Sequence, residues 1–360
     1  MLNEIIQNLY SAYLDARRHK RFTSNQLRFE LNLESELLQL AHELETRTYE
    51  IQPSKCFICN HPVKREIVAP DFRDRVIHHL LFNWLEPIYE RFLIYDCYSC
   101  RKGKGTHFGI NRARGFMRAV SDDYRKPAWV LKLDISGFFM SIDRQKLYEM
   151  ICDTLRRASY ENITDRKLCL YLLEKVVFND PLKNAEYKSP AAEWHGLPQN
   201  KSLKYSADGC GLPIGNVTSQ LFGNVYLNPL DQFVKRKLHI KYYGRYVDDF
   251  FLMDCNRREL LLAKERIREF LQINLGLTLH PAKWQLQPVT HGFQFLGAFI
   301  LPNRVYPNRR VESEFRMKVA QAHGLENLPP EVRQSYLGYF SHFDCFRRFS
   351  LAFGLLPLKF

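Results

Sequence analysis

Asp248 and Asp249, two adjacent carboxylates within Tyr243–Met253, are the residues with the clearest potential for chemistry. Aromatic and aliphatic β-forming residues flank them on both sides, a pattern that predicts a hairpin with the acids at or near its turn. Adjacent acids in apolar surroundings repel each other and lose hydration, so a positive partner must neutralise them. A hard divalent cation with oxygen ligands is the commonest such partner. The alternative is an ordinary turn whose Asp side chains bond the backbone while their charges stay in water.

A third carboxylate, Asp134, ends an apolar β run that starts at Trp129 and is followed by a turn. A strand-end acid beside a two-acid hairpin is the donor set that two-metal phosphoryl transfer requires. Few other reactions need three acids on adjacent strands with so little general acid–base equipment nearby. The sequence therefore predicts that Asp134 meets Asp248 and Asp249 on one sheet.

Helices and short strands are expected around these acids. Apolar residues at helical spacing predict helices over 2–21, 34–46, 71–92, 144–158, 165–178 and 257–275. Strand-like segments cover 49–70, 284–289 and 293–301, and 211–230 begins as a loop that becomes a helix. The connection over 179–210 is longer than most loops inside compact domains, which indicates a functional or mobile segment.

The net charge of +13 points to a polyanionic partner. Lys and Arg exceed Asp and Glu in both 51–130 and 301–360, and two separated basic regions favour a groove over a charged tail. No apolar run approaches the length of a membrane span, and the N-terminus lacks a basic-then-apolar export signal. We therefore expect a cytoplasmic protein with no membrane partner.

Nine cysteines, an odd number, argue against a disulfide framework. Cys56 and Cys59 could combine with Cys97 and Cys100 into a four-thiolate zinc site. Ordinary packing is the alternative, because Cys56 and Cys59 lie in a predicted strand whose alternation puts them on opposite faces.

Seven sequence blocks in a fixed order, over roughly residues 50–345, resemble the reverse transcriptases. The blocks are KREIVAPDFRDRVIHHLL (64–81), RKGKGTHFGINRA (101–113), KLDISGFFMSID (132–143), GLPIGNVTSQLFGNVYLNPLD (211–231), YVDD (246–249), LTLHPAKW (277–284) and FQFLGAFI (293–300). A lone YxDD is weak evidence, whereas seven ordered blocks are strong evidence and leave little room for the ordinary-turn interpretation. The resemblance implies an RNA-directed DNA polymerase that uses template RNA, a cDNA primer end and deoxynucleoside triphosphates (dNTPs).

The resemblance assigns roles to the acids and to one lysine. Asp134, Asp248 and Asp249 match the catalytic metal-binding acids, and the Ile135 carbonyl is an expected extra ligand. The implied cofactor is Mg²⁺, two ions per active site, with Mn²⁺ as a substitute. Lys283 matches the lysine that protonates the leaving pyrophosphate; its alternative is a surface lysine.

Further positions match residues that bind the incoming nucleotide. Gly137 and Phe138 would offer backbone N–H groups to the triphosphate. Phe139 falls at the aromatic steric gate that excludes a 2′-hydroxyl; its alternative is a core aromatic. Lys64 and Arg65 fall where the fingers grip the triphosphate, and the alternative for both is a solvated surface charge.

Ile214 and Gly215 would border the nucleotide sugar, and Phe295, Leu296 and Gly297 resemble the primer grip. Most reverse transcriptases carry Gln where this chain has Ile214, and Ile cannot make the hydrogen bonds of a Gln amide. A loss of about 1.4 kcal/mol of discrimination is a tenfold rise in errors. Residues 101–106 suit a loop that contacts the template backbone, with an ordinary flexible loop as the alternative.

The segment LPIGNVTSQ (212–220), together with 201–203 and 335–343, resembles the reverse transcriptases of diversity-generating retroelements. Those enzymes make frequent errors at template adenines (mutagenic retrohoming). They are bacterial or phage-encoded and work with a structured RNA and a small basic accessory protein. The alternatives are a retron- or abortive-infection-type reverse transcriptase, or an inactive RNA-binding scaffold of the same fold. The intact acids weigh against the scaffold.

The expected fold is an α+β right-hand polymerase with fingers, a palm built on an antiparallel sheet, and a helical thumb. The expected parts are an N-terminal helical extension (1–48), fingers (49–128), the first part of the palm (129–143), fingers and palm helices with a connecting loop (144–210), palm (211–301) and thumb (302–360). We expect no RNase H, maturase or endonuclease domain after the thumb.

Overall fold

The computed structural model describes residues 2–18, 22–60, 63–157, 163 and 165–345. The ends of the predicted first helix (19–21) and of the predicted thumb (346–360) lie outside the described residues. The chain divides into two compact units, each made of three segments. Unit 1 comprises Met1–Ile94, Ile135–Phe233 and Ile267–Leu279; unit 2 comprises Tyr95–Asp134, Val234–Arg266 and His280–Phe360.

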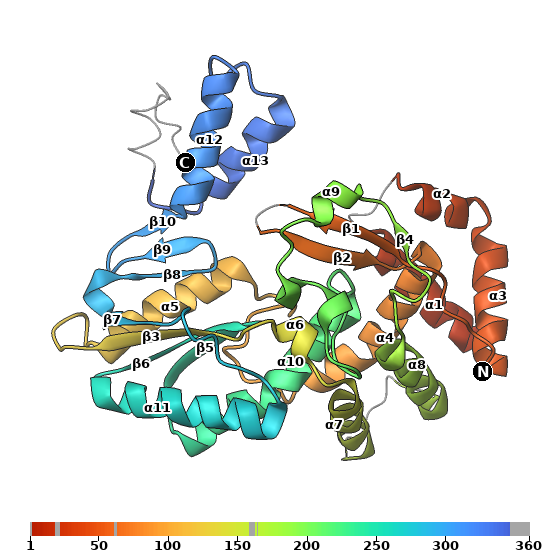
Figure 1. The fold of residues 1–360 in the computed structure, drawn as a ribbon, viewed down its shortest axis with the longest axis horizontal. Coiled ribbons are helices and arrows are strands. Elements are labelled where there is room, and N and C mark those ends of the chain that lie inside the picture. The colour runs from red at the N-terminus through yellow and green to blue at the C-terminus, as the bar shows by residue number, and fades with distance from the viewer. Residues whose placement is uncertain (1, 19–21, 61–62, 158–162, 164, 346–360) are drawn as a thin grey trace. The chain divides into compact units, whose positions relative to one another are not determined.

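Unit 1 is mainly helical and contains one small sheet (Figure 1). Its described α-helices are α1 (Leu2–Arg17), α2 (Ser24–Leu31), α3 (Leu33–Thr46), α4 (Phe72–Glu90), α6 (Phe138–Ser141), α7 (Arg144–Arg157), α8 (Arg166–Phe178), α9 (Ala191–Trp194) and α10 (Val217–Gln232). Its sheet has the order β2 (Arg65–Ala69), β1 (Lys55–Cys59), β4 (Glu186–Tyr187). Helix α1 packs on α4 through a stripe that includes buried Ile5 and Leu9.

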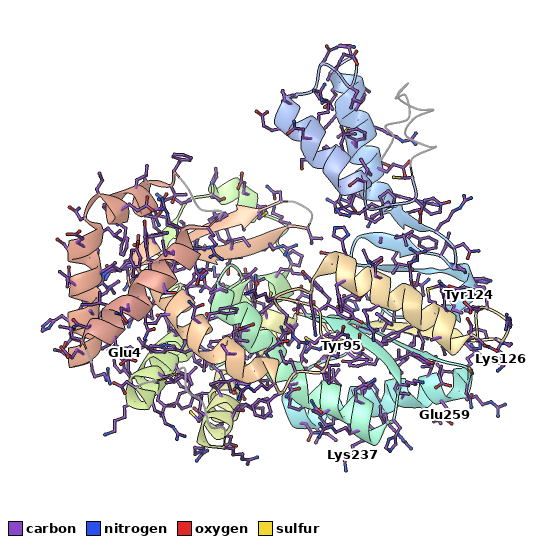
Figure 2. All side chains as sticks on the ribbon, turned by 180° about the vertical axis from the view of Figure 1, so that it is seen from behind. Glu4, Tyr95, Tyr124, Lys126, Lys237 and Glu259 are labelled. Atoms are coloured by element: carbon purple, nitrogen blue, oxygen red, sulfur yellow. The ribbon has the colours of Figure 1, made fainter. Side chains whose placement is uncertain are left out.

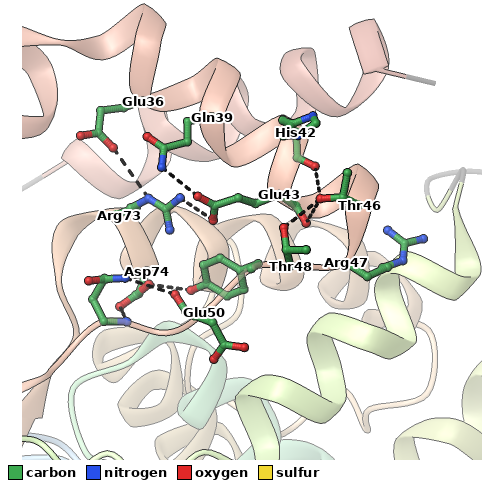
Figure 3. A network of polar contacts seen from close by, with 12 residues as sticks. Glu36, Gln39, His42, Glu43, Thr46, Arg47, Thr48, Glu50, Arg73 and Asp74 are labelled. Carbon is green, nitrogen blue, oxygen red and sulfur yellow. Dashed lines mark hydrogen bonds and ion pairs between the residues drawn. The ribbon is translucent and has the colours of Figure 1, made fainter.

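A network of polar contacts joins α3, α4 and the segment after α3 (Figure 3). Arg73 of α4 pairs with Glu43 at 2.6 Å and with Glu36 at 3.7 Å. Beside it, the buried Asp74 carboxylate accepts hydrogen bonds from the Tyr49 hydroxyl at 2.6 Å and the Gln52 backbone N–H at 2.9 Å. Burial raises the pKa of Asp74 to about 7, against an ordinary value of 3.8.

This raised pKa predicts that Asp74 makes stability depend on pH. Between about pH 3.8 and pH 7, Asp74 is protonated in the folded chain but ionised in the unfolded chain. Its contribution to stability is therefore full below about pH 3.8 and is lost as the pH rises through about 7. Between pH 5 and pH 8, wild type should lose about 2–3 kcal/mol of unfolding free energy relative to Asp74→Asn, which cannot titrate. Urea unfolding of both proteins across that range measures the difference. Parallel pH profiles would show that Asp74 has an ordinary pKa.

Unit 2 is built on a four-stranded antiparallel sheet of order β5 (Tyr242–Tyr246), β6 (Asp249–Asp254), β3 (Trp129–Asp134), β7 (Gln285–Pro288). A second antiparallel sheet has the order β10 (Val305–Pro307), β9 (Ala298–Ile300), β8 (Phe293–Phe295). The other helices are α5 (Thr106–Val120), α11 (Arg257–Phe270, in unit 2 up to residue 266), α12 (Arg309–Gln321) and α13 (Pro330–Phe340). Figures 1 and 2 show α5 on one face of the four-stranded sheet and α11 on the other.

Aromatic rings form the part of the unit 2 core that joins its two sheets. The Phe251 ring of β6 lies 5.3 Å from that of Phe293 and 4.9 Å from that of Phe295, and all three side chains are buried. Offset and edge-to-face aromatic packing of this kind adds to the stabilisation from burial alone. The palm-like sheet is therefore fixed against the β8–β9 hairpin.

The observed elements differ from the sequence-based expectations at three places. Helix α2 forms where no helix was predicted, and its short apolar stripe, which buries Phe29, is too brief to stand out. The predicted strand over 293–301 is a hairpin of β8 and β9, broken at Leu296 and Gly297, both with positive φ. The helix expected over 257–275 is α-helical only to Phe270; a π-helical turn follows and ends at Gly276, which has φ 64°.

Among the residues that the structure describes, no helix has both the length and the apolar content needed to cross a bilayer. Residues 95–128, which the predicted division assigns to the fingers, belong to unit 2 together with the four-stranded sheet. The division into extension, fingers, palm and thumb stays a prediction.

Candidate active site

Asp134 and Asp249 lie directly opposite each other at the ends of two paired strands. The antiparallel register of β3 and β6 pairs Leu133 with Phe250 and Asp134 with Asp249. Directly opposed residues of an antiparallel pair project from the same face of the sheet with their Cβ atoms about 5 Å apart. Asp134 and Asp249 therefore lie on one sheet, and the binding of metal ions by the three acids stays a prediction.

The turn between β5 and β6 consists of Val247 and Asp248 and brings the second hairpin acid to the same edge. Val247 has φ 54°, an uncommon conformation for a β-branched residue, so the surrounding contacts must hold this turn in place. Asp248 and Asp134 are both close enough to raise the pKa of Asp249 by like-charge repulsion. The charges of both other acids therefore act on Asp249.

The Asp249 carboxylate is half-buried, with 26% of its side chain exposed. Burial raises its pKa to about 6 from an ordinary 3.8; Lys132 opposes the rise, and the charges of Asp248 and Asp134 add to it. Its Oδ1 atom is buried and has no hydrogen-bond partner among the described residues, while Oδ2 lies 3.2 Å from the Lys132 Nζ. An enclosed carboxylate oxygen without a partner is costly unless a ligand satisfies it.

These observations fit a divalent cation bound by Asp134 and Asp249, with Asp248 beside them. Carboxylate oxygens are the donors that Mg²⁺ prefers, and the enclosed Oδ1 of Asp249 still needs a partner. In the described residues, however, no three His, Cys, Asp or Glu side chains are already gathered as a metal centre. The backbone positions the acids, and their side chains would still have to converge for all three to bind.

Lys132 is a site residue to which the sequence analysis assigned no role. It stands two residues before Asp134 on β3, so strand alternation places both side chains on one face. Its ammonium pairs with Asp249 across the sheet at 3.2 Å. The spacing of two in the run Lys132-Leu133-Asp134 was the signal that could have revealed it.

Lys283 lies near the acids, as its sequence block suggested. Its Nζ is 3.8 Å from Asp134 Oδ2, and the side chain is 56% exposed. The backbone N–H of Lys283 donates to the His280 ring, while the His280 backbone N–H donates to the Asp134 carbonyl at 2.8 Å. The turn over 280–283 thus connects Lys283 to the end of β3, and its role as a proton donor stays a prediction.

Arg245 is a fully buried charged residue on β5 that the sequence analysis also missed. Its guanidinium donates to the Val247 carbonyl at 3.1 Å and to Cys97 Sγ at 3.3 Å. Its backbone groups bond the segment Asp96–Tyr98, which runs along the outer edge of the strand. Arg245 therefore holds the turn that carries Asp248.

The residues predicted to bind the nucleotide belong to unit 1, as does Ile135, the buried residue after Asp134. Gly137 has φ 55° and precedes helix α6, which starts at Phe138. Phe138 is buried and Phe139 is half-buried. Both rings lie close to Gly223 of α10, where an added Cβ would be 3.2 Å from the Phe138 ring and 3.4 Å from the Phe139 ring. Core packing therefore accounts for Phe138, while the Phe139 ring stays partly accessible.

The predicted loop around Ile214 is fixed by backbone hydrogen bonds within unit 1. The Leu212 N–H donates to the Phe139 carbonyl at 2.8 Å, and the Val68 N–H of β2 donates to the Ile214 carbonyl at 3.2 Å. Gly215 has φ 127°, a region that an L side chain rarely adopts. A direct backbone hydrogen bond thus joins the segment that contains Phe139 to the loop that contains Ile214.

Lys64 and Arg65 stand at the start of β2. The Lys64 ammonium donates to the His195 carbonyl at 2.6 Å, and the Arg65 Nε donates to the Val63 carbonyl at 3.4 Å. Both residues are half-buried, and both of these hydrogen bonds are exposed to solvent. Their contact with a triphosphate remains a prediction.

The predicted primer grip is the tight turn of the β8–β9 hairpin. Phe295 pairs with Ala298, and Leu296 and Gly297 form the two-residue turn with φ 52° and 77°, values typical of the hairpin turn that matches strand twist. The Gly297 carbonyl accepts hydrogen bonds from the Asn308 N–H and from the Tyr339 hydroxyl of α13. The tight hairpin is present, and its contact with a primer remains a prediction.

The predicted template loop is organised around an exposed aromatic residue, Tyr95 (labelled in Figure 2). The Lys104 Nζ lies 4.4 Å from the centre of the Tyr95 ring and donates a hydrogen bond to the Tyr95 backbone carbonyl. The Arg112 guanidinium lies 5.2 Å from the centre of the same ring. Gly103 and Gly105 supply the positive φ angles that turn the chain into α5. The two cations hold the ring by cation–π contacts, and the contact of this loop with a template remains a prediction.

Among the described residues, the cysteines of the two candidate pairs form no disulfide bond. Cys56 and Cys59 lie on β1 in unit 1 with Cys56 buried and Cys59 half-buried, as strand alternation requires; Cys97 and Cys100 lie in unit 2.

The fold and the acid-bearing antiparallel sheet define an α+β polymerase of the right-hand type. Residues 60–300 match the family model described as reverse transcriptase (RNA-dependent DNA polymerase). The chain belongs to the reverse transcriptase family. The expected fold class and the expected enzyme class, RNA-directed DNA polymerase, are thus confirmed.

Known proteins similar to this chain agree with that assignment. Protein YkfC of Escherichia coli is 23% identical over 336 residues, covering 82% of this chain and 80% of YkfC. The group II intron-encoded protein LtrA of Lactococcus lactis is 26% identical over 204 residues, 56% of this chain and 28% of LtrA. A telomerase from Candida tropicalis, solved in complex with a fragment of telomeric RNA, shares the fold with a TM-score of 0.51 at 12% identity, covering 87% of this chain and 58% of that chain. The chain thus spans most of YkfC but well under two thirds of the other two.

Proposed function

We propose that this chain copies template RNA into cDNA by two-metal nucleotidyl transfer, with Asp134, Asp248 and Asp249 as the metal ligands. The observation that carries the proposal is the direct pairing of Asp134 with Asp249, whose buried Oδ1 has no hydrogen-bond partner. The chemistry supplied by two bound Mg²⁺ ions, or by Mn²⁺, is activation of the primer 3′-hydroxyl and stabilisation of the leaving oxygens. The Ile135 carbonyl is a further proposed ligand.

The chain's own residues would bind, orient and protonate the reactants. Lys283, exposed and next to Asp134, is suited to give a proton to the leaving pyrophosphate. In unit 1, Gly137, Phe138, Lys64 and Arg65 are the proposed triphosphate-binding residues. The other proposed roles are the steric gate for Phe139, contact with the nucleotide sugar for Ile214 and Gly215, and the primer grip for Phe295, Leu296 and Gly297.

The proposed biological setting is a diversity-generating retroelement, with frequent errors at template adenines. It is supported by Ile214 within LPIGNVTSQ, where an aliphatic side chain replaces an amide. The proposed partners are a structured template RNA, in keeping with the basic charge, and a small basic accessory protein. The bacterial relatives support a bacterial or phage-encoded enzyme that works in the cytoplasm.

Primer extension tests the proposed activity. Purified protein with Mg²⁺ and dNTPs should extend a DNA primer on an RNA template, and EDTA should stop the reaction. Sequenced products on matched RNA and DNA templates would give template preference and error spectrum together. RNA binding without any metal-dependent incorporation would instead favour the inactive scaffold.

Ile214→Gln tests the proposed low fidelity. A Gln amide can bond polar groups of a paired nucleotide, so we expect misincorporation opposite adenine to fall about tenfold, which corresponds to about 1.4 kcal/mol of discrimination. Ile214→Leu, which keeps an apolar side chain, is the matched control and should retain the wild-type error rate. Sequencing of cDNA from all three proteins is the measurement, and equal error rates for wild type and Ile214→Gln would contradict the prediction.

A further inference from the structure

The long connection between α8 and α10, whose role the proposed function leaves open, contains two consecutive 3₁₀ turns, Gln199–Lys201 and Leu203–Tyr205. We refer to residues 199–205 as the connection segment. Its middle residue, Ser202, is only 1% exposed, which is unusual for a surface loop. Something in unit 1 therefore holds this segment in place.

The anchor is Glu66, a 3% exposed carboxylate on β2. Its Oε2 accepts a hydrogen bond from the Ser202 hydroxyl at 2.8 Å, and its Oε1 accepts one from the Leu203 backbone N–H at 2.9 Å. A buried carboxylate is tolerated only when its oxygens are satisfied, and these two bonds engage both of them. Glu66 thus connects β2 to the connection segment through a pair of buried hydrogen bonds.

The segment packs closely against two glycines of the sequence blocks linked to nucleotide binding. A Cβ on Gly137 would lie 3.1 Å from Asn200 Cβ and 3.4 Å from the Asn200 carbonyl oxygen. A Cβ on Gly211, which opens the Ile214 loop, would lie 2.8 Å from both Leu203 Cδ2 and Ser206 Oγ. Both glycines also have positive φ, so the chain passes them without room for a side chain.

A further contact joins the same connection to the start of β2. The Lys64 ammonium, two residues before Glu66, donates to the carbonyl of His195 at 2.6 Å. Residues 195–206 therefore contact β2, the start of α6 and the start of the Ile214 loop, three places that are far apart in the sequence. One anchored segment sets the spacing among them.

We propose that Glu66 is a positioning residue that, by holding the connection segment against Gly137, sets the affinity of the enzyme for the incoming deoxynucleoside triphosphate. The inference rests on the proposed function, because Gly137 and Lys64 are proposed triphosphate ligands. It adds Glu66 and the connection segment to the dNTP site, and neither of them has a role in the polymerase assignment. The alternative is that Glu66 only stabilises the fold of unit 1.

Three variants separate these outcomes. Glu66→Ala removes both acceptors, Ser202→Ala removes one hydrogen bond, and Glu66→Gln keeps the shape and an acceptor oxygen. The matched control is Glu186→Ala, which removes an exposed acid from the same sheet. Thermal unfolding of each protein reports whether it folds.

Fluorescent dATP binding to the enzyme–primer–template complex, with Ca²⁺ in place of Mg²⁺, gives the dNTP dissociation constant without catalysis. We expect it to rise about tenfold in Glu66→Ala, by a smaller factor in Ser202→Ala, and by less than threefold in Glu66→Gln and Glu186→Ala. The KM for dNTP in primer extension should follow the same order, while the KM for primer–template stays unchanged. Trypsin cleavage after Lys201 and Lys204 should accelerate in Glu66→Ala.

Faster cleavage in Glu66→Ala with an unchanged dissociation constant would overturn the proposal and leave Glu66 a structural role. Unchanged cleavage and affinity would overturn it as well. If wild type bound dATP but extended no primer, the proposed polymerase activity would fail while the binding series still decided the role of Glu66. If Glu66→Ala failed to fold, the Ser202→Ala series would carry the test.

Discussion

Replacing Asp134 with Asn is expected to reduce primer extension by about a thousandfold without unfolding the chain. The substitution keeps the size of the side chain but removes the charge that faces Asp249 across β3 and β6. Loss of one metal ligand costs several kcal/mol of transition-state stabilisation, and about 4 kcal/mol corresponds to a thousandfold in rate. Single-turnover extension rates at saturating Mg²⁺ measure the effect.

The matched control is Asp254→Asn, at the opposite end of β6 from Asp249. Asp254 pairs with Trp129, and its carboxylate caps the next turn by accepting from the Asn256 N–H, a bond that an Asn oxygen can keep. We expect wild-type extension from this control. Extension by Asp134→Asn within tenfold of wild type would remove Asp134 from the metal site, whatever its position in the sheet.

Replacing Arg245 with Met should destabilise the chain by about 3 kcal/mol and also slow extension. The substitution leaves the half-buried Val247 carbonyl and the buried Cys97 without the guanidinium that bonds them. Leaving buried polar groups without partners costs about 1–3 kcal/mol each. Because Val247 has a positive φ, the loosened turn should also misplace Asp248 and lower the rate about tenfold.

Urea unfolding and extension rates of Arg245→Met, Arg245→Lys and Lys241→Met test this prediction. Arg245→Lys keeps a positive charge but not the planar set of donors, so it should lie between wild type and Arg245→Met in both measurements. Lys241→Met removes an exposed cation one residue before β5 and should change neither. A stability of Arg245→Met within 0.5 kcal/mol of wild type, on the order expected for a surface substitution, would show that the buried guanidinium is dispensable.

The chemistry of the sheet could be predicted from the sequence because it depends on local pattern. The hairpin of Tyr246 and Asp249 and the strand that ends at Asp134 both follow from residues a few positions apart. The order of the seven blocks then connected these local pieces to one family. Strand alternation would also have placed Lys132 beside Asp134, since the two are separated by a single residue.

The partners of buried polar groups could not be predicted in this way, because they depend on packing between distant segments. Arg245 is buried on a strand along whose edge residues 96–98 pair. Glu66 is satisfied by Ser202 and Leu203, more than a hundred residues later. The division into two units likewise reflects contacts among separate chain segments, which no composition shift marks in the sequence.

The central claim is that Asp134, Asp248 and Asp249 hold two cations that join a nucleotide to a primer. Anomalous X-ray diffraction from crystals of the chain with primer–template, a non-hydrolysable dNTP and Mn²⁺ tests it most directly. We expect two anomalous peaks about 3.5–4 Å apart, each within about 2.0–2.3 Å of carboxylate oxygens from these acids. Manganese bound elsewhere in the ternary complex, with no peak at the Asp134–Asp249 pair, would contradict it.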